Sequence, residues 1–241
     1  MTAQLKRTFF EPKEFPFLLP VQEAWQMIQA EWDEARDKAL IFPDPSKGLL
    51  DSGEWKKCEI FAWGMKVEKN VTLIPRTAEV LFAVPGLMQA AFYLLGPGSH
   101  ITPHRGVTDK VLRAHVGMHC PPNCHLRVGA DIRQEADGRL LIFDDMNMHE
   151  AWNKSTEWRT VLHLDFFRPE VRDDPTIPGW MKDLRMKLAQ RHPHVIPELV
   201  HAGVDFDGEL RAWFLANPGK AAPERCKPEE WESFVAWRDR R

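Results

Sequence analysis

Histidine and arginine side chains gather in the middle of the sequence. Seven of the ten histidines lie between residues 100 and 163. His104 lies in the stretch TPHRG, His149 follows two carboxylates in DDMNMHE, and Arg159 comes ten residues after His149. Neutral imidazoles are common protein ligands of divalent transition metals, and a guanidinium can hold a carboxylate through two parallel hydrogen bonds. These residue types therefore indicate a metal centre that also holds an organic acid.

A pattern of short strands surrounds these side chains. Between about residues 88 and 169, segments with period-two alternation are separated by turn signals such as GPGS, PPNC and ADG. Strands at this spacing are typical of a sandwich or barrel of the jelly-roll kind. Apolar residues at helical spacing precede them, in residues 20–40 and 75–86, and follow them after Pro169. The sequence predicts a mainly β fold with flanking helices and a double-stranded β-helix core of the jelly-roll or cupin type.

We expect one compact domain with three parts, since a chain of 241 residues buries a substantial core. Residues 1–87 are expected to form an N-terminal elaboration of helices and strands, and residues 88–170 the jelly-roll catalytic core. Residues 171–241 are expected to form a C-terminal helical extension. Within that extension we predict helices over residues 180–192, 207–219 and 228–241.

The last predicted strand, RTVLHLDFF, has one apolar and one mixed face. Side chains alternate along a strand. One face carries Arg159, Val161, His163 and Asp165, and the other carries Thr160, Leu162, Leu164 and Phe166. The second set is the better core face, so Arg159 is expected to point toward a more polar interior, where a fixed cation is costly without an anion. In LRAHVGM, Arg113 and His115 likewise share a face. The two strands together predict an interior that holds a metal and carboxylates.

The composition excludes several classes of protein. A net charge of −3 argues against a nucleic-acid binder. The first twenty residues lack the apolar region of a signal peptide, and no stretch approaches the length of a membrane span. The pair Cys120 and Cys124 has loose spacing for zinc and no matching second pair, so the four cysteines are expected to be reduced thiols. We expect a cytoplasmic protein.

Four stretches of the sequence together resemble the aspartyl/asparaginyl β-hydroxylase family of iron(II)- and 2-oxoglutarate-dependent dioxygenases. They are GPGSHITPHRG, LRAHVGM, LLIFDDMNMHEAWN and WRTVLHLDFFRP, and the likeness covers about residues 88–170. Other non-haem iron oxygenases of this fold place a carboxylate ligand two residues after the first histidine. Members of this family carry a glycine there, as this chain does with Gly106.

The resemblance implies a role for each matching residue. His104 and His149 would bind iron(II) and form the catalytic centre. Arg159 would bind the remote carboxylate of 2-oxoglutarate, and His115 the carboxylate next to the metal. Arg113 matches a family arginine that contacts the substrate.

Two positions depart from the family pattern. Tyr93 stands where the best-known members carry a serine that helps to hold the remote carboxylate, and its hydroxyl could serve the same end. Val111 stands where members that act on proteins carry a further substrate arginine. Asp144 and Asp145 are expected to shape the turn before His149 rather than bind the metal.

We therefore expect an enzyme that uses O2 to hydroxylate an aliphatic carbon. The lost arginine favours a small, carboxylate-bearing or amino-acid-type substrate over a protein. Within the same class, the alternatives are hydroxylation of protein-bound Asp or Asn, hydroxylation of a lipid acyl chain, and halogenation at the position freed by Gly106. Outside the class, the alternative is a non-catalytic or zinc-binding jelly-roll module that keeps the histidine pair for stability.

Overall fold

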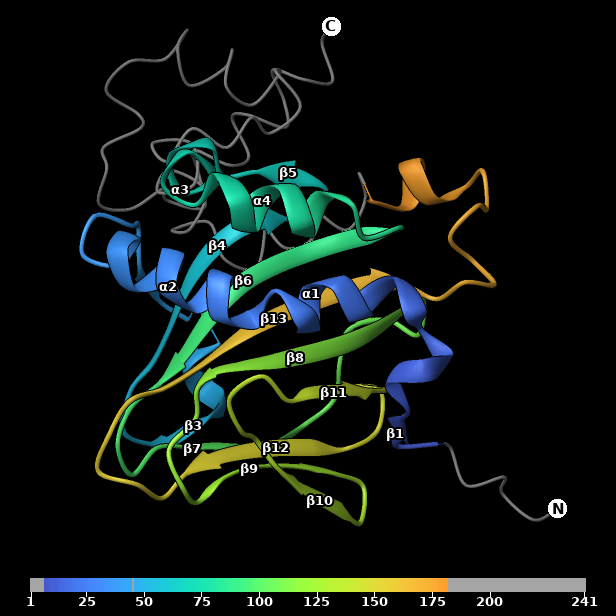
Figure 1. Cartoon of the computed structure of the whole chain (residues 1–241). Helices are drawn as coiled ribbons and strands as arrows, with labels where there is room; N and C mark the ends of the chain where they lie inside the picture. The colour runs from blue at the N-terminus through green and yellow to red at the C-terminus, as the bar shows by residue number, and fades with distance from the viewer. Residues whose placement is uncertain (1–6, 45, 182–241) are drawn as a thin grey trace, which may run out of the picture.

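Two antiparallel sheets face each other and form the body of the protein. The structure is a computed structural model, and it describes residues 7–44 and 46–181. The larger sheet has the order β1 (Phe9–Phe10), β11 (Leu140–Phe143), β8 (Val111–His119), β13 (Arg159–Phe167), β6 (Leu87–Leu95), β4 (Trp55–Ala62) and β2 (Phe42–Pro43), with β5 (Met65–Lys66) paired to β4. The smaller sheet has the order β10 (Asp131–Gln134), β9 (Cys124–Val128), β12 (His149–Asn153), β7 (His100–His104) and β3 (Leu50–Ser52). The predicted jelly-roll core is confirmed (Figure 1).

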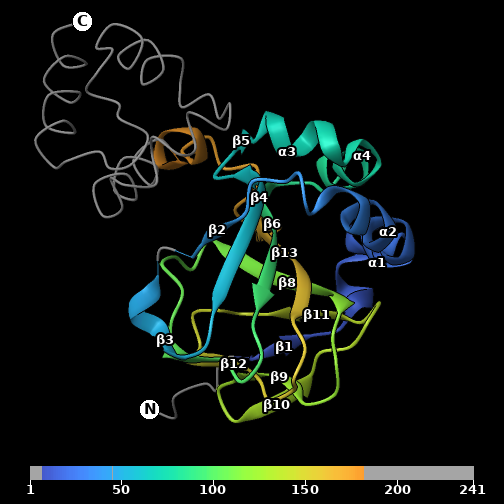
Figure 2. The same ribbon diagram turned by 90° about the vertical axis from the view of Figure 1, so that its left-hand side faces the viewer.

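Helices cover the outer face of the larger sheet. They are α1 (Leu19–Glu23), α2 (Trp25–Ala35), α3 (Glu68–Leu73) and α4 (Pro75–Phe82). Short 3-10 helices precede α1 at Pro12–Glu14 and Pro16–Leu18, and a third, at Lys47–Leu49, lies beside β7 of the smaller sheet. Figures 1 and 2 both place α1, α2 and α4 on the side of this sheet away from the smaller sheet. Trp32 of α2 stacks on Phe92 of β6 with ring centroids 4.2 Å apart. None of the described helices has the length and apolar character needed to cross a bilayer.

The two faces of β13 divide as the alternation predicts. Leu162, Leu164 and Phe166 are fully buried in the core beneath the helices. The opposite face points between the two sheets, where Arg159, His163 and Asp165 are also buried. An apolar cluster shares that space and consists of Phe9, Leu95, Ile101, Leu126, Val128, Leu141, Phe143 and Ala151. The barrel interior is therefore part apolar and part ionic.

One helix differs from the sequence prediction. The helix expected over residues 20–40 is two helices, because the chain turns at Ala24, where ψ is 2° rather than the helical value near −42°. Gln22 and Trp25 on either side of the turn both contact Gly138. His104 lies at the end of strand β7, and HLRVGADIR forms a hairpin, β9 and β10, that turns at Gly129 with φ 59°. The glycine accepts this left-handed backbone without the strain that a side chain would bring.

The boundary expected at residue 87 falls between paired strands. β4, from the expected N-terminal part, pairs with β6 of the expected catalytic core. β1 and β3 likewise pair with β11 and β7. The N-terminal part thus contributes strands to both sheets. The helices predicted after Pro169 lie outside the described residues, except for Trp180 and Met181.

Candidate metal centre and carboxylate site

His104 and His149 lie side by side at the ends of adjacent strands. His104 ends β7, His149 begins β12, and the two are partners in the strand register. Their ring centroids are 4.1 Å apart. The Nδ1 of His104 bonds the carbonyl of Thr102 at 2.8 Å, and that of His149 bonds the carbonyl of Asn147 at 3.0 Å. A carbonyl only accepts hydrogen bonds, so each Nδ1 carries the proton and each Nε2 keeps its lone pair.

The chemistry of this pair fits a divalent transition metal. The Nε2 of His149 is buried and has no hydrogen-bond partner within the described structure. Burial lowers the pKa of His149 to about 3, and the Arg113 charge adds to the shift, so the ring stays neutral as a metal ligand must. Burial also lowers the pKa of His104. Across residues 7–44 and 46–181, no cluster of three or more His, Cys, Asp or Glu side chains is arranged to hold a metal. The candidate centre therefore consists of the two histidines.

Asp145 fills the space that a side chain at position 106 would need. A Cβ atom on Gly106 would lie 2.2 Å from the Oδ2 of Asp145, which is far inside van der Waals contact. The backbone N–H of Gly106 also donates to the Asp145 carbonyl at 2.8 Å. Gly106 is therefore a glycine because a neighbouring carboxylate already occupies its side-chain space. Burial raises the pKa of Asp145 to about 6.

Arg113 is held between two carboxylates. Its Nε and Nη2 donate to Asp165 at 2.8 and 3.1 Å, and Nη2 lies 3.2 Å from Asp145. Asp165 and Arg113 are cross-strand partners on β13 and β8, as are His163 and His115. Burial alone would raise the pKa of Asp165, but the Arg113 charge outweighs it and lowers this pKa strongly. The guanidinium expected to contact substrate is therefore already balanced inside the protein.

Glu135 joins Arg159 and His115, and the sequence analysis did not single it out. Arg159 donates from Nε and Nη2 to the two Glu135 oxygens at 2.6 Å each, and His115 Nδ1 donates to Oε1 at 2.9 Å. Burial alone would raise the pKa of Glu135, but the Arg159 charge and the His115 hydrogen bond outweigh it and lower the pKa to about 2. The Glu135 carboxylate occupies the position that a bound organic acid would take between these two side chains. Its contacts show that Arg159 and His115 together can hold a carboxylate.

The described structure does not bring the Tyr93 hydroxyl to Arg159. Tyr93 stacks on His163 with ring centroids 4.2 Å apart, and its hydroxyl accepts a hydrogen bond from Gln89 at 3.3 Å. Gln89 lies four residues earlier on the same strand, whereas Arg159 is the register partner of Leu95. A contact between Tyr93 and a cosubstrate stays a prediction.

Asp144 stabilises the turn before His149 through a hydrogen bond to the backbone. Asp144 Oδ1 accepts a hydrogen bond from the N–H of Met146 at 3.0 Å, and Asp144 also pairs with Arg168 at 2.8 Å.

The thiols of Cys58, Cys120 and Cys124 are free, as expected, and Cys226 lies outside the described residues.

A second buried ionic cluster lies on the β4 side of the barrel. Lys57 Nζ lies 2.6 Å from Glu59 and 3.8 Å from Asp44, and Gln89 donates to Glu59 at 3.2 Å. This cluster could not be predicted from the sequence, because WKKCEIFA alternates only weakly between polar and apolar residues. For Glu135 there was a usable signal, since a buried Arg159 requires an anion and DIRQEADGR offers carboxylates close by.

Comparisons with known proteins agree with the geometry. The sequence model of the aspartyl/asparaginyl beta-hydroxylase family matches residues 22–169, more than half of the chain. The ornithine lipid ester-linked acyl 2-hydroxylase of Rhizobium tropici is 32% identical over 228 residues, which are 91% of this chain and 78% of that protein. The human aspartyl/asparaginyl beta-hydroxylase is 27% identical over 177 residues, which are 68% of this chain but only 23% of that protein.

Among solved structures, a Pseudomonas putida prolyl-4-hydroxylase matches with 16% identity and a TM-score of 0.44, over 68% of this chain and 94% of that chain. The family match over residues 22–169 confirms the resemblance of the four sequence stretches. The chain therefore belongs to the aspartyl/asparaginyl β-hydroxylase family.

Proposed function

We propose that this protein is an iron(II)- and 2-oxoglutarate-dependent hydroxylase. The observation that supports this most directly is the pair formed by the half-buried His104 and the buried His149, whose Nε2 atoms are both left with lone pairs. Imidazole nitrogen suits iron(II) among other divalent metals. A guanidinium and an imidazole that already hold a carboxylate, Arg159 and His115, lie in the same barrel interior.

Each residue has a defined task in this proposal. His104 and His149 would hold iron through Nε2, with the carbonyls of Thr102 and Asn147 fixing the tautomer and the ring orientation. Arg159 and His115 would hold the carboxylates of 2-oxoglutarate. When bound, iron and 2-oxoglutarate supply the oxidising chemistry, in which O2 converts the 2-oxo acid to succinate and carbon dioxide while a substrate carbon is hydroxylated.

The protein also excludes water from this space. Phe143 packs edge-on against His149 with ring centroids 5.8 Å apart and lies 5.2 Å from His115. Phe143, Leu126 and Val128 are almost completely buried in the apolar cluster between the sheets. A dry, shaped cavity protects a reactive metal centre from side reactions.

We infer that the substrate is the acyl chain of a lipid. The Rhizobium tropici relative, an ornithine lipid ester-linked acyl 2-hydroxylase, supports this, since its sequence matches 91% of this chain. Arg113 is already paired with Asp165 and Asp145, so it has no unbalanced charge to offer a free carboxylate. Val107, next to Gly106, and Met148, next to His149, are 64% and 40% exposed and place apolar groups beside the centre.

A small carboxylate-bearing substrate remains the second candidate. Arg113 keeps about 20% of its side-chain surface exposed, so a substrate carboxylate could compete with Asp145 for its Nη2. Halogenation is disfavoured, because a halide near position 106 would lie beside the Asp145 carboxylate.

Succinate release and product mass test the proposed function. The full chain is incubated with iron(II), 2-oxoglutarate and O2, together with either ester-linked acyl lipids in micelles or a panel of free amino acids. We expect succinate above the uncoupled background with the lipids, and a product that has gained one oxygen atom on the acyl chain. The same product should be absent with His149→Ala.

The other outcomes of this assay discriminate between the alternatives. Stimulation by amino acids alone would move the substrate to the second candidate. No succinate with any substrate, together with tight zinc binding, would favour the non-catalytic module.

A further inference from the structure

Glu135 holds the two side chains that the proposed function assigns to the cosubstrate. We propose that Glu135 is an internal competitor for that site, so that 2-oxoglutarate binds by displacing the Glu135 carboxylate from Arg159 and His115. This inference rests on the proposed function. It assigns to this chain a residue that controls which acids can enter.

Hydrogen-bonding capacity is the first argument. The Nε and Nη2 edge of Arg159, the edge that takes a carboxylate side-on, is filled by Glu135. His115 has no ring nitrogen left over, because Nδ1 bonds Glu135 and Nε2 lies 3.2 Å from Nδ1 of His163. A second carboxylate can gain these contacts only if the first one leaves.

Charge is the second argument. Arg159 and Glu135 are 1% and 2% exposed, and together they form a neutral pair away from water. Adding a carboxylate beside this pair would leave two anions against one guanidinium, and an unbalanced buried charge is costly. Exchange of one carboxylate for another keeps the balance at Arg159.

The surroundings of Glu135 allow it to leave. It follows β10, an edge strand that pairs only with β9 and whose residues are largely exposed. The turn after it is seated on Gly117, where a Cβ atom would lie 1.9 Å from the Ala136 carbonyl oxygen. The exposed Arg139 donates to the Gln134 carbonyl at 3.1 Å, next to Glu135. In this proposal the backbone stays in place while the Glu135 side chain rotates away from Arg159, toward solvent and the Arg139 cation.

Such a competitor would act as a filter on the acids that bind. A simple monocarboxylate gains only what Glu135 loses, so it has no advantage over the internal group. A diacid that is also held at the metal gains a second anchor, and this can offset the cost of moving Glu135. The site would thus favour 2-oxo diacids over monoacids.

The test compares Glu135→Gln with the wild-type protein and with a matched control. The control is Glu150→Gln, because Glu150 is also held by one arginine and one histidine, Arg127 and His100, but on the outer side of the smaller sheet. Binding of 2-oxoglutarate to the manganese-loaded full chain is measured by calorimetry without oxygen. Glutarate, which lacks the 2-oxo group, is tested by thermal shift on metal-free protein.

We expect Glu135→Gln to bind 2-oxoglutarate at least tenfold more tightly than wild type. Glutarate should raise the melting temperature of Glu135→Gln and leave that of wild type and Glu150→Gln nearly unchanged. Unchanged or weaker binding by a folded Glu135→Gln would overturn the proposal and make Glu135 a positioning residue for Arg159. If this variant does not fold, Glu135→Asp is used, whose shorter carboxylate should compete less and bind 2-oxoglutarate more tightly than wild type. Binding no tighter than wild type would overturn the proposal.

The two proposals fail in different ways. If wild type releases no succinate with any substrate but glutarate binds metal-free Glu135→Gln, the competitor stands and the proposed function falls. If wild type turns over 2-oxoglutarate and Glu135→Gln binds it no more tightly, the function stands and the competitor falls.

Discussion

The imidazoles of His104 and His149 are equivalent in their local bonding, because each Nδ1 donates to the carbonyl oxygen of the residue two positions earlier in the chain. The two rings come from neighbouring antiparallel strands, and their centroids are 4.1 Å apart. A backbone anchor of this kind fixes the tautomer, so both Nε2 atoms are ready to bind a metal before it arrives.

Removal of one imidazole should abolish stoichiometric metal binding. We expect His149→Ala to lose more manganese or iron(II) affinity than the roughly 10–100-fold that loss of an outer-shell partner usually costs. Calorimetry without oxygen measures this loss. His100→Ala, which removes a histidine paired with Glu150 away from the centre, should keep wild-type affinity. Equal losses in the two variants would contradict the assignment.

The pair of Arg159 and Glu135 should show strong energetic coupling. Arg159→Gln leaves Glu135 buried without its cation, and we expect a loss of about 3–5 kcal/mol in the free energy of unfolding. The double variant Arg159→Gln with Glu135→Gln removes both charges and should recover part of that loss. Urea unfolding of the four proteins measures the coupling. Additive losses would show that the two side chains do not stabilise each other.

A methyl group at position 106 should clash with Asp145. Since a Cβ on Gly106 would lie 2.2 Å from the Asp145 carboxylate, we expect Gly106→Ala to cost about 1–3 kcal/mol through overpacking. Adding Asp145→Ala frees the space, so the double variant should be more stable than the sum of the single changes predicts. Thermal or urea unfolding of the metal-free proteins tests this. A Gly106→Ala protein as stable as wild type would contradict the close approach.

His163 should make the protein less stable in acid. Burial lowers the pKa of His163 to about 3, although the Asp165 charge opposes the shift. Between pH 6.5 and 3 the unfolded chain therefore binds more protons at this residue than the folded chain, and stability falls as the pH falls. His163→Gln removes up to one proton from this difference. The slope of the unfolding free energy against pH should therefore fall by up to about 1.4 kcal/mol per pH unit. Asp145, with its pKa raised to about 6, acts in the opposite sense and remains in both proteins. Urea unfolding of metal-free protein across this range measures the slope, and an equal slope in the two proteins would contradict the prediction.

Alternation along the strands made much of the site predictable. Two features follow from a period of two, which depends only on backbone geometry: the inward face of β13, and the position of Arg113 and His115 on the same face of β8. The break at Ala24 could not be predicted, because it depends on contacts of Gln22 and Trp25 with Gly138, more than a hundred residues away.

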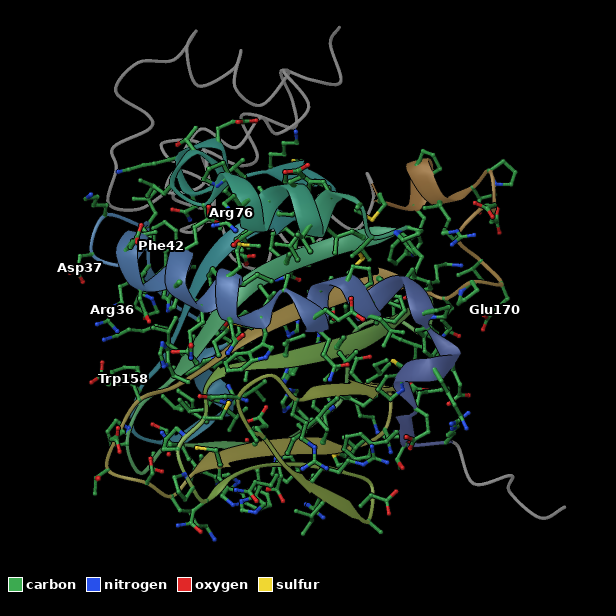
Figure 3. All side chains as sticks on the ribbon, viewed as in Figure 1. Arg36, Asp37, Phe42, Arg76, Trp158 and Glu170 are labelled. Carbon is green, nitrogen blue, oxygen red and sulfur yellow. The ribbon has the colours of Figure 1, made fainter. Side chains whose placement is uncertain are left out.

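The partner of Arg159 shows the same limit. The cost of a buried cation predicted that an anion must be near, but it could not tell a bound acid from a side chain. Glu135 reaches Arg159 from the end of an edge strand in the other sheet. Only the packing of the two sheets brings these residues together. Trp158, at the rim of the molecule (Figure 3), comes just before β13 begins, and the next residue, Arg159, is buried inside the barrel.

The crowding of Gly106 by Asp145 also bears on how this sequence can evolve. A glycine codon becomes an aspartate codon through a single nucleotide change, so a lineage with this chain can readily sample a third protein ligand. In that mutant the new carboxylate at position 106 and that of Asp145 would compete for the same space. Selection for a folded protein would remove it. A descendant could accept a carboxylate at position 106 only if position 145 changed as well. Substitutions at these two positions are therefore expected to depend on each other.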